Sequence, residues 1–135
     1  MKPIIQEEIT GCAIASSAAI AGVSYAEAKE IANGIGIYAD DPALWSETNY
    51  IRQLLKQFGV ETDSKEIPFV NWESLPNVAL LSTKWHLEEN KPFWHWAVFV
   101  RERNKSYVLD SKKSLTTMDI ISDSIKQYIN TAKNA

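Results

Sequence analysis

The only cysteine of the chain, Cys12, directly follows Gly11, where an opening segment that reads as extended gives way to an Ala- and Ile-rich stretch. A thiol at the start of a helix meets the positive end of the helix dipole and unpaired backbone N–H groups, both of which favour the thiolate. Gly11 leaves the approach to the sulfur sterically open. The position predicts a nucleophile, and the alternative is a small apolar residue packed in the core.

A hairpin predicted over residues 94–110 supplies a base and a carboxylate. Its first segment, 94–101, is apolar and aromatic, and its second ends at Asp110. If residues 101–104 form a four-residue loop, His95 lies directly opposite Asp110, with Cβ atoms roughly 4.5–5.5 Å apart. One ring nitrogen then bonds the carboxylate and the other faces a thiol. The alternative is a histidine satisfied in an aromatic core and an aspartate that opens a turn.

Gln6 lies in the segment before Cys12 and completes a set of four groups. Acyl transfer requires donors to an oxyanion, which the Cys12 amide and the Gln6 side chain would supply. Alone, Gln6 reads as a surface residue, but with the other three it meets the full requirement for acyl transfer. His86 is the rival base, although no aspartate lies within hairpin reach of it.

Capping residues and apolar spacing predict the elements that position these groups. A capping box formed by Ser24 and Glu27 begins a second helix, and Ile121, Ile125, Tyr128 and Ile129 have the spacing of a last one. The predicted elements are helices at 12–21, 24–33, from 46 or 48 to 58, and 118–133, and strands at 60–67, 78–84, 94–101 and 106–110. This order predicts an α+β fold in a single domain over residues 1–135.

The other aromatic and loop residues have simpler interpretations. Trp94 and Trp96 flank His95 on the opposite strand face and are expected in the core, whereas Trp45 and Trp85 are candidates to line a cleft. Residues 34–45 read as a loop, and its acidic part, 38–41, is interpreted as solvated. The pair of glycines at 34 and 36 lacks the rest of a phosphate-binding loop.

Composition excludes several classes of protein. The chain has 135 residues, a formal net charge of −3 and one cysteine, which disfavours nucleic-acid and membrane-surface binding, an internal disulfide and a cysteine-based zinc site. The two histidines and the carboxylates show no ligand spacing, so we expect no metal or cofactor. The apolar run 12–23 follows acidic residues and is broken by serines, unlike a signal peptide. We expect a cytoplasmic protein or one exported without a cleaved signal.

The order Gln6, Cys12, His95 and Asp110, with three helices before a sheet, resembles the papain-like cysteine peptidases. The similarity spans roughly residues 4–112 and is greatest to the compact bacteriocin-processing type and its bacterial relatives. It implies that Gln6 is the oxyanion donor, Cys12 the nucleophile, His95 the base and Asp110 the orienting carboxylate. Ala13 stands where that family has glycine after the cysteine, and Ser111 where it often has proline. Its members are usually fused to a membrane-spanning transporter.

These observations predict a thiol hydrolase that acts on a peptide or protein substrate. A deamidase or an acyltransferase uses the same residues, so the bond that is cleaved stays open. A papain-like binding module without turnover and a plain α+β interaction domain with a packed Cys12 are the alternatives from other classes.

Overall fold

The structure is a computed structural model that describes residues 1, 4–7, 10–45, 47–83, 86–88, 90–103, 105–110, 113–116 and 127–133. Residues 86–88, 91–93, 110, 113–116 and 132–133 are described by their backbone alone. The predicted helix 118–133 and Trp85 therefore lie wholly or partly outside the described residues.

Three helices precede the sheet, as the sequence predicts: α1 (Cys12–Ala21), α2 (Tyr25–Gly34) and α3 (Asn49–Gln57). Every residue of α1 is buried, because its small side chains allow close approach on all faces. Gly22 ends α1 with φ 77°, a left-handed conformation in which its N–H donates to the Ala18 carbonyl. The Ser24 hydroxyl accepts from the Glu27 amide at 3.1 Å, which confirms half of the predicted capping box.

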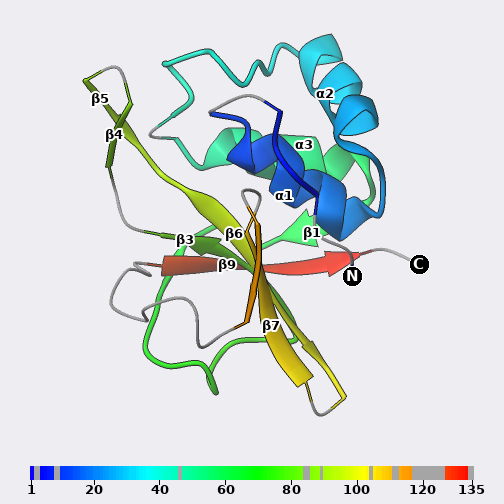
Figure 1. Ribbon diagram of the computed structural model, residues 1–135, viewed down its shortest axis with the longest axis vertical. Coiled ribbons are helices and arrows are strands. Elements are labelled where there is room, and N and C mark those ends of the chain that lie inside the picture. The colour runs from blue at the N-terminus through cyan, green and yellow to red at the C-terminus, as the bar shows by residue number, and fades with distance from the viewer. Residues whose placement is uncertain are drawn as a thin grey trace.

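Most of the strands lie in one antiparallel sheet (Figure 1). Its order is β1-β9-β3-β6-β7-β8, with β2 also paired to β9, and β4 and β5 form a separate hairpin. The strands are β1 (Val60–Thr62), β2 (Ile67–Pro68), β3 (Val78–Ser82), β4 (His86–Glu88), β5 (Lys91–Phe93), β6 (Trp96–Glu102), β7 (Lys105–Asp110), β8 (Lys113–Thr116) and β9 (Gln127–Lys133).

The prediction of a helix through residue 133 is wrong for residues 127–133, which form β9 in the interior of the sheet. Leu80 of β3 lies opposite Ile129 on one side of β9, and β1 pairs along the other. Tyr128 and Ile129 are both buried, on opposite faces of the sheet. A strand buried on both faces shows no polar–apolar alternation, so its sequence pattern is easily mistaken for that of a helix.

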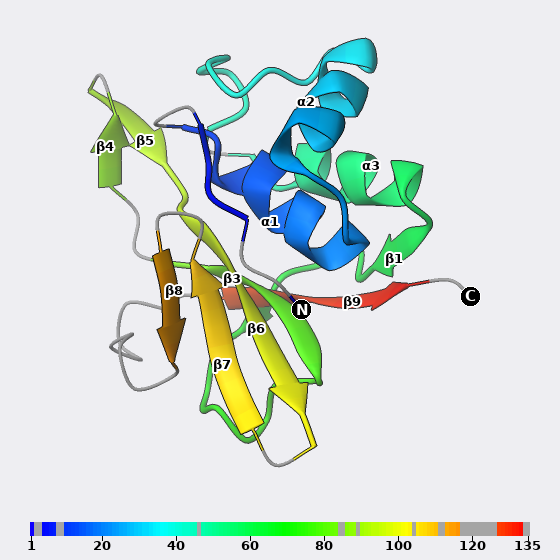
Figure 2. The ribbon, with the colours of Figure 1, turned by 45° about the vertical axis from the view of Figure 1, so that its right-hand side comes forward.

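Two apolar clusters cover the two faces of the sheet. The larger lies between the sheet and the three helices, which form one layer on that side (Figure 2), and contains Trp96 and Val98. The smaller contains Ala97 and Phe99, with Trp72 stacked on Phe99 at 5.8 Å between ring centroids. Successive residues of β6 therefore alternate between the helical face and the opposite face.

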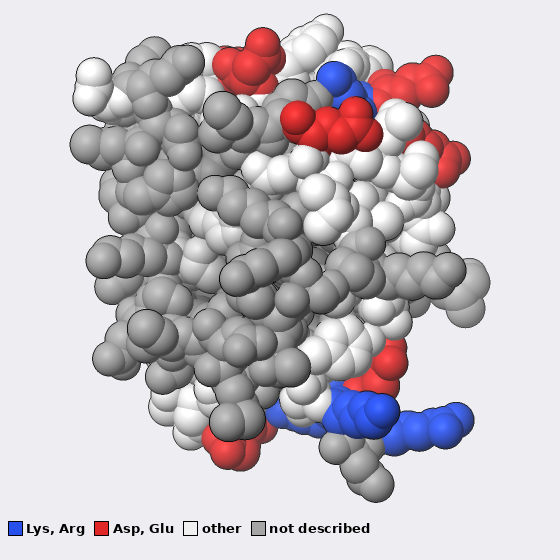
Figure 3. Space-filling view, in the orientation of Figure 1, with Lys and Arg blue, Asp and Glu red and all other residues white. Residues whose placement is uncertain are grey.

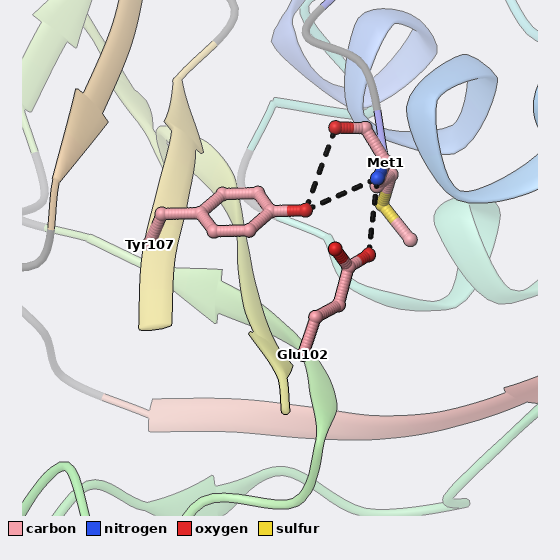
Figure 4. Close-up of polar contacts among 3 residues, drawn as sticks. All are labelled: Met1, Glu102 and Tyr107. Carbon is pink, nitrogen blue, oxygen red and sulfur yellow. Dashed lines mark hydrogen bonds and ion pairs between the residues drawn. The ribbon is translucent and has the colours of Figure 1, made fainter. Parts of the chain in front are cut away.

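The opening segment is held at the far end of the sheet by polar contacts of Met1 (Figure 4). Its ammonium group donates to the Glu102 carboxylate at 3.0 Å and to the Tyr107 hydroxyl oxygen at 3.1 Å. The bond from this ammonium group holds the pKa of Glu102 below its ordinary value. These contacts join the segment that carries Gln6 to the β6–β7 hairpin.

A second polar network fixes the start of α3. The Thr48 hydroxyl donates to the Glu66 carboxylate, and Arg52 donates to Thr48 at 3.0 Å and to the Asp63 carbonyl at 2.7 Å. The Thr48 hydroxyl, followed by the charge of Arg52, holds the pKa of Glu66 below its usual value. The network is half-buried and ties α3 to the chain between β1 and β2.

Ile129→Ala tests the placement of β9. Because Ile129 has no exposed surface, we expect the variant to lose about 2–5 kcal/mol of unfolding free energy in urea denaturation. Ile5→Ala, at a residue that is 53% exposed, is the matched control and should change stability by about 0.5 kcal/mol or less. A loss as small as that of the control would contradict an interior strand.

Glu66→Gln tests the network at α3. A carboxylate whose pKa is lowered by folding stabilises the native state above its unfolded pKa, and this contribution is lost as the pH falls through the folded pKa. We therefore expect a loss of about 1 kcal/mol or less at pH 7, since the pair is partly exposed. The loss should vanish in acid, whereas Glu61→Gln, at an exposed position of β1, should show no such trend. A pH-independent difference would refute the linkage.

Candidate active site

Cys12 begins α1, as predicted, but its sulfur is not open to solvent. Gly11 occupies the position before the helix with no side-chain cap, and it is itself buried. Cys12 has no exposed surface and belongs to the cluster between the helices and the sheet. The steric access expected from Gly11 is therefore absent in this conformation, because neighbouring elements close over the start of the helix.

The sulfur contacts the backbone on both sides of His95. The thiol donates to the Trp94 carbonyl with a sulfur–oxygen distance of 3.8 Å, and the Trp96 amide donates to the sulfur at 3.4 Å. One turn further along α1, the Ser16 hydroxyl donates to the Trp96 carbonyl at 3.4 Å. In a strand these three backbone groups point to the same edge. The start of α1 thus occupies the edge of β6 beyond the last β6–β7 pair (Figure 2).

The other edge of the same segment is held by Thr83. The Thr83 amide donates to the His95 carbonyl at 2.8 Å, and the Thr83 hydroxyl donates to the same oxygen at 2.9 Å. This pairing continues the β3–β6 register, in which Ser82 lies opposite Trp96. His95 therefore lies directly opposite Thr83, on a stretch of chain whose two edges contact α1 and the end of β3.

The loop before α3 closes a third side. The Trp94 amide donates to the Trp45 carbonyl at 3.1 Å, and the Trp45 indole donates to the Ala39 carbonyl at the same distance. The Thr10 hydroxyl donates to that same carbonyl at 2.6 Å. The loop is thereby tied both to the opening segment and to the segment that carries His95.

The predicted register of the hairpin is wrong by two residues. Asp110 lies opposite Ala97 and not opposite His95, because Glu102 pairs with Lys105 and the connection has two residues, not four. Arg103 adopts a φ of 54°, the left-handed conformation that tight hairpin turns require. A two-residue shift keeps positions 95 and 110 on the same face, as diagonal neighbours about 7–8 Å apart.

Gln6 is half-buried in the opening segment before Cys12. Two of the four predicted residues, Cys12 and His95, lie in one region, because the Cys12 sulfur contacts the backbone on both sides of His95. The backbone register places Asp110 next to this region. Trp96 is fully buried and Trp94 half-buried against the core, as expected. The rival base His86 pairs through its backbone with Phe93 in the β4–β5 hairpin.

Tyr50 and Thr83 are neighbours of this region that the sequence did not single out. Tyr50 is buried, and burial, followed by the nearby Cys12, raises the pKa of its phenol far above the ordinary value, so the phenol stays neutral. Its spacing from Leu54 on α3 marks it as core, which hides its proximity to the sulfur. Thr83 follows an apolar strand and carries no signal in the sequence.

Trp45 is buried and does not line an open cleft. With Tyr50, Thr10 and Ala13 it surrounds a cavity of about 10 Å³, the space of a single water molecule. A cavity of this size admits no peptide.

Charges of both signs are distributed over the surface in Figure 3. Acidic side chains gather at the helical end and basic ones near the turn of the β6–β7 hairpin. Within the described part of the chain, no group of three or more His, Cys, Asp or Glu residues could hold a metal ion. No helix among these same residues is both long enough and apolar enough to cross a bilayer.

Similarity to known proteins is found in the fold and not in the sequence: no protein-family model and no curated protein matches the chain. One solved structure that matches is the peptidase domain of Streptococcus ComA, a bi-functional ABC transporter involved in quorum sensing. It has a TM-score of 0.64 and 15% sequence identity, with 98% of each chain covered.

A second match is a double-glycine-motif protease from an AMS/PCAT transporter, in complex with its leader peptide. The TM-score is 0.63 with 17% identity, over 98% of this chain and 91% of that one. The chain thus shares its fold, three helices packed on an antiparallel sheet, with these two peptidase domains, which confirms the predicted papain-like α+β fold class.

Cys12→Ala and Cys12→Ser test how much the hydrogen bonds at the Cys12 sulfur contribute to the free energy of unfolding. Alanine leaves the buried Trp96 amide without its acceptor, so we expect a loss of about 1–3 kcal/mol in urea denaturation. Serine keeps both a donor and an acceptor and should lose less. Equal losses in the two variants would show that the hydrogen bonds at the sulfur contribute nothing to stability.

Proposed function

We propose that the chain is a papain-like thiol hydrolase, a cysteine peptidase, with Cys12 as its nucleophile. The observation that supports this most strongly is the pair of hydrogen bonds between the Cys12 sulfur and the backbone on either side of His95. They join the start of α1 to the segment that carries His95. The peptidase fold of the structural neighbours is consistent with this function.

The proposed reaction follows the chemistry of thiol acyl transfer. His95 takes the thiol proton, and the Cys12 sulfur forms a bond to the carbonyl carbon of the substrate. The C–N bond then breaks, and the leaving amine receives the proton from His95. A water molecule, deprotonated by His95, attacks the thioester, which releases the acid and restores the thiol.

Gln6 and Asp110 have supporting roles in the proposal. Gln6 and the Cys12 amide would donate to the oxyanion of the tetrahedral intermediate, where loss of one donor typically lowers kcat by about 10²–10³-fold. Asp110 would orient the imidazole from its diagonal position. Its role rests on the backbone register and on the similarity to the peptidase family.

The substrate class that we propose is a peptide or an extended protein segment. One structural neighbour, a double-glycine-motif protease, is in complex with a leader peptide. A deamidase or an acyltransferase that acts on a protein side chain uses the same groups, and a non-catalytic papain-like binding module is the second candidate. The complete burial of Cys12 favours that second candidate.

Alkylation of Cys12 by iodoacetamide tests the pairing with His95, and the single cysteine makes the product unambiguous. An imidazole that accepts the thiol proton keeps thiolate present near neutrality. His95→Ala should therefore slow alkylation at pH 6.5 by about tenfold or more, with rates that converge at pH 9.5. His86→Ala is the matched control and should leave both rates unchanged. Equal slowing at both pH values would indicate altered access, not a lost base.

Mass spectrometry of a peptide library incubated with the protein separates the reaction types. A peptidase adds one water and splits the chain, whereas a deamidase releases ammonia from glutamine without a cut. We expect splitting that is abolished in Cys12→Ala and reduced about 10²–10³-fold in Gln6→Ala. Peptide binding by the wild type without any turnover would leave the binding module as the function.

A further inference from the structure

One peptide unit, formed by the His95 carbonyl and the Trp96 amide, lies between Thr83 and Cys12. At its carbonyl end the oxygen accepts two hydrogen bonds from Thr83, at 2.8 Å from the amide and 2.9 Å from the hydroxyl. At its other end the N–H donates to the Cys12 sulfur at 3.4 Å. The two ends point to opposite edges of the chain, so Thr83 and the sulfur never meet directly.

We propose that Thr83 is a positioning residue for Cys12, acting through the His95–Trp96 peptide unit. The inference rests on the proposed function in one respect: the Cys12 sulfur that Thr83 positions is the nucleophile of the proposed reaction. An ordinary strand pair needs only the backbone amide of Thr83, so the second bond, from the hydroxyl, is the unusual feature.

Hydrogen bonds to a carbonyl polarise its peptide unit and strengthen the donor at the other end. The Thr83 hydroxyl thus increases the positive character of the Trp96 N–H that faces the sulfur. It also fixes the plane of the unit, because two bonds from one residue to one oxygen resist rotation. The effect is retained because Thr83 is only 7% exposed and Trp96 is fully buried, so water does not compete for these groups.

Among the described residues, the Thr83 hydroxyl bonds the His95 carbonyl and no other group. A valine at position 83 would fill the same volume and suit a strand end equally well. A threonine whose hydroxyl duplicates a backbone bond adds little to pairing, since the oxygen is already satisfied. Its consequence falls on the far end of the peptide unit, at the sulfur.

Thr83→Val and Thr83→Ser form the test pair. Valine removes the hydroxyl and keeps the shape, whereas serine keeps the hydroxyl and removes the methyl. The first measurement is the amide proton shift of Trp96 by ¹⁵N–¹H NMR, which reports the N–H···S bond directly. We expect an upfield shift in Thr83→Val and a value near wild type in Thr83→Ser.

The second measurement is the rate of Cys12 alkylation at pH 6.5 relative to pH 9.5. This ratio should fall about two- to fivefold in Thr83→Val, the size expected when one neutral hydrogen bond is lost, and be restored in Thr83→Ser. A purely structural role would slow or speed both rates together. If Thr83→Val does not fold, Thr83→Ala removes the same hydroxyl and must show the same shift.

An unchanged amide proton shift of Trp96 in folded Thr83→Val or Thr83→Ala would overturn the proposal. An equal change of this shift in Thr83→Ser would also overturn it, because the effect would then belong to the methyl group. The amide shift does not depend on hydrolysis. A protein that cleaves no amide bond but shows the predicted shifts would therefore refute the proposed function and leave the role of Thr83 intact.

Discussion

The structure depends on the docking of α1 against the edge of β6. The Cys12 thiol and the Ser16 hydroxyl, one helical turn apart, bond the three backbone groups at that edge from Trp94 to Trp96. The two groups of Trp96 are buried, and buried backbone groups must be paired. The first helix of the chain thus takes the place of a neighbouring strand at the end of the sheet. Without it, that end of the sheet would leave amides and carbonyls unsatisfied in an apolar core.

The same region is closed by the loop from Ile37 to Trp45, which is held both by hydrogen bonds and by burial. The Thr10 hydroxyl and the Trp45 indole donate to the Ala39 carbonyl, and the Trp94 amide donates to the Trp45 carbonyl. Each such bond contributes about 0.5–1.5 kcal/mol net. Ile37 and Trp45 are also buried in the same apolar cluster as Cys12. The loop is therefore part of the packed core in which the sulfur lies.

Local features of the sequence predict the helices but not the pairing of the strands. Gly22, Ser24 and the spacing of Leu54 and Leu55 act within a few residues, so α1 to α3 lie where the sequence predicts them. Hairpin register depends instead on the length of the turn, and Arg103 adopts a left-handed conformation without the glycine that usually announces it. β9 takes its conformation from β1 and β3, which are distant in the sequence. Local turn geometry therefore decided the register, and tertiary context decided the conformation of β9.

The same division holds at the candidate site. Cys12 at a helix start was readable from Gly11 and the small residues that follow. Its burial against Trp94 and Trp96 depends instead on contacts across more than eighty residues, and the bonds from Thr83 join residues 12 apart in the sequence. The hydrogen bonds to His95 involve its backbone, and no pattern of side chains encodes them.

The choice of cysteine at this position is itself informative. Sulfur is a weak acceptor and a weak donor, yet here it satisfies a buried amide and contacts the carbonyl of half-buried Trp94. A hydroxyl group forms stronger bonds of the same kind, and Ser16 does so one turn later. Hydrogen bonding would therefore favour oxygen at position 12, whereas the apolar surroundings of a fully buried residue favour sulfur. A site that keeps the weaker partner where backbone pairing matters most departs from local consistency, and such departures are typical of positions where chemistry sets the residue.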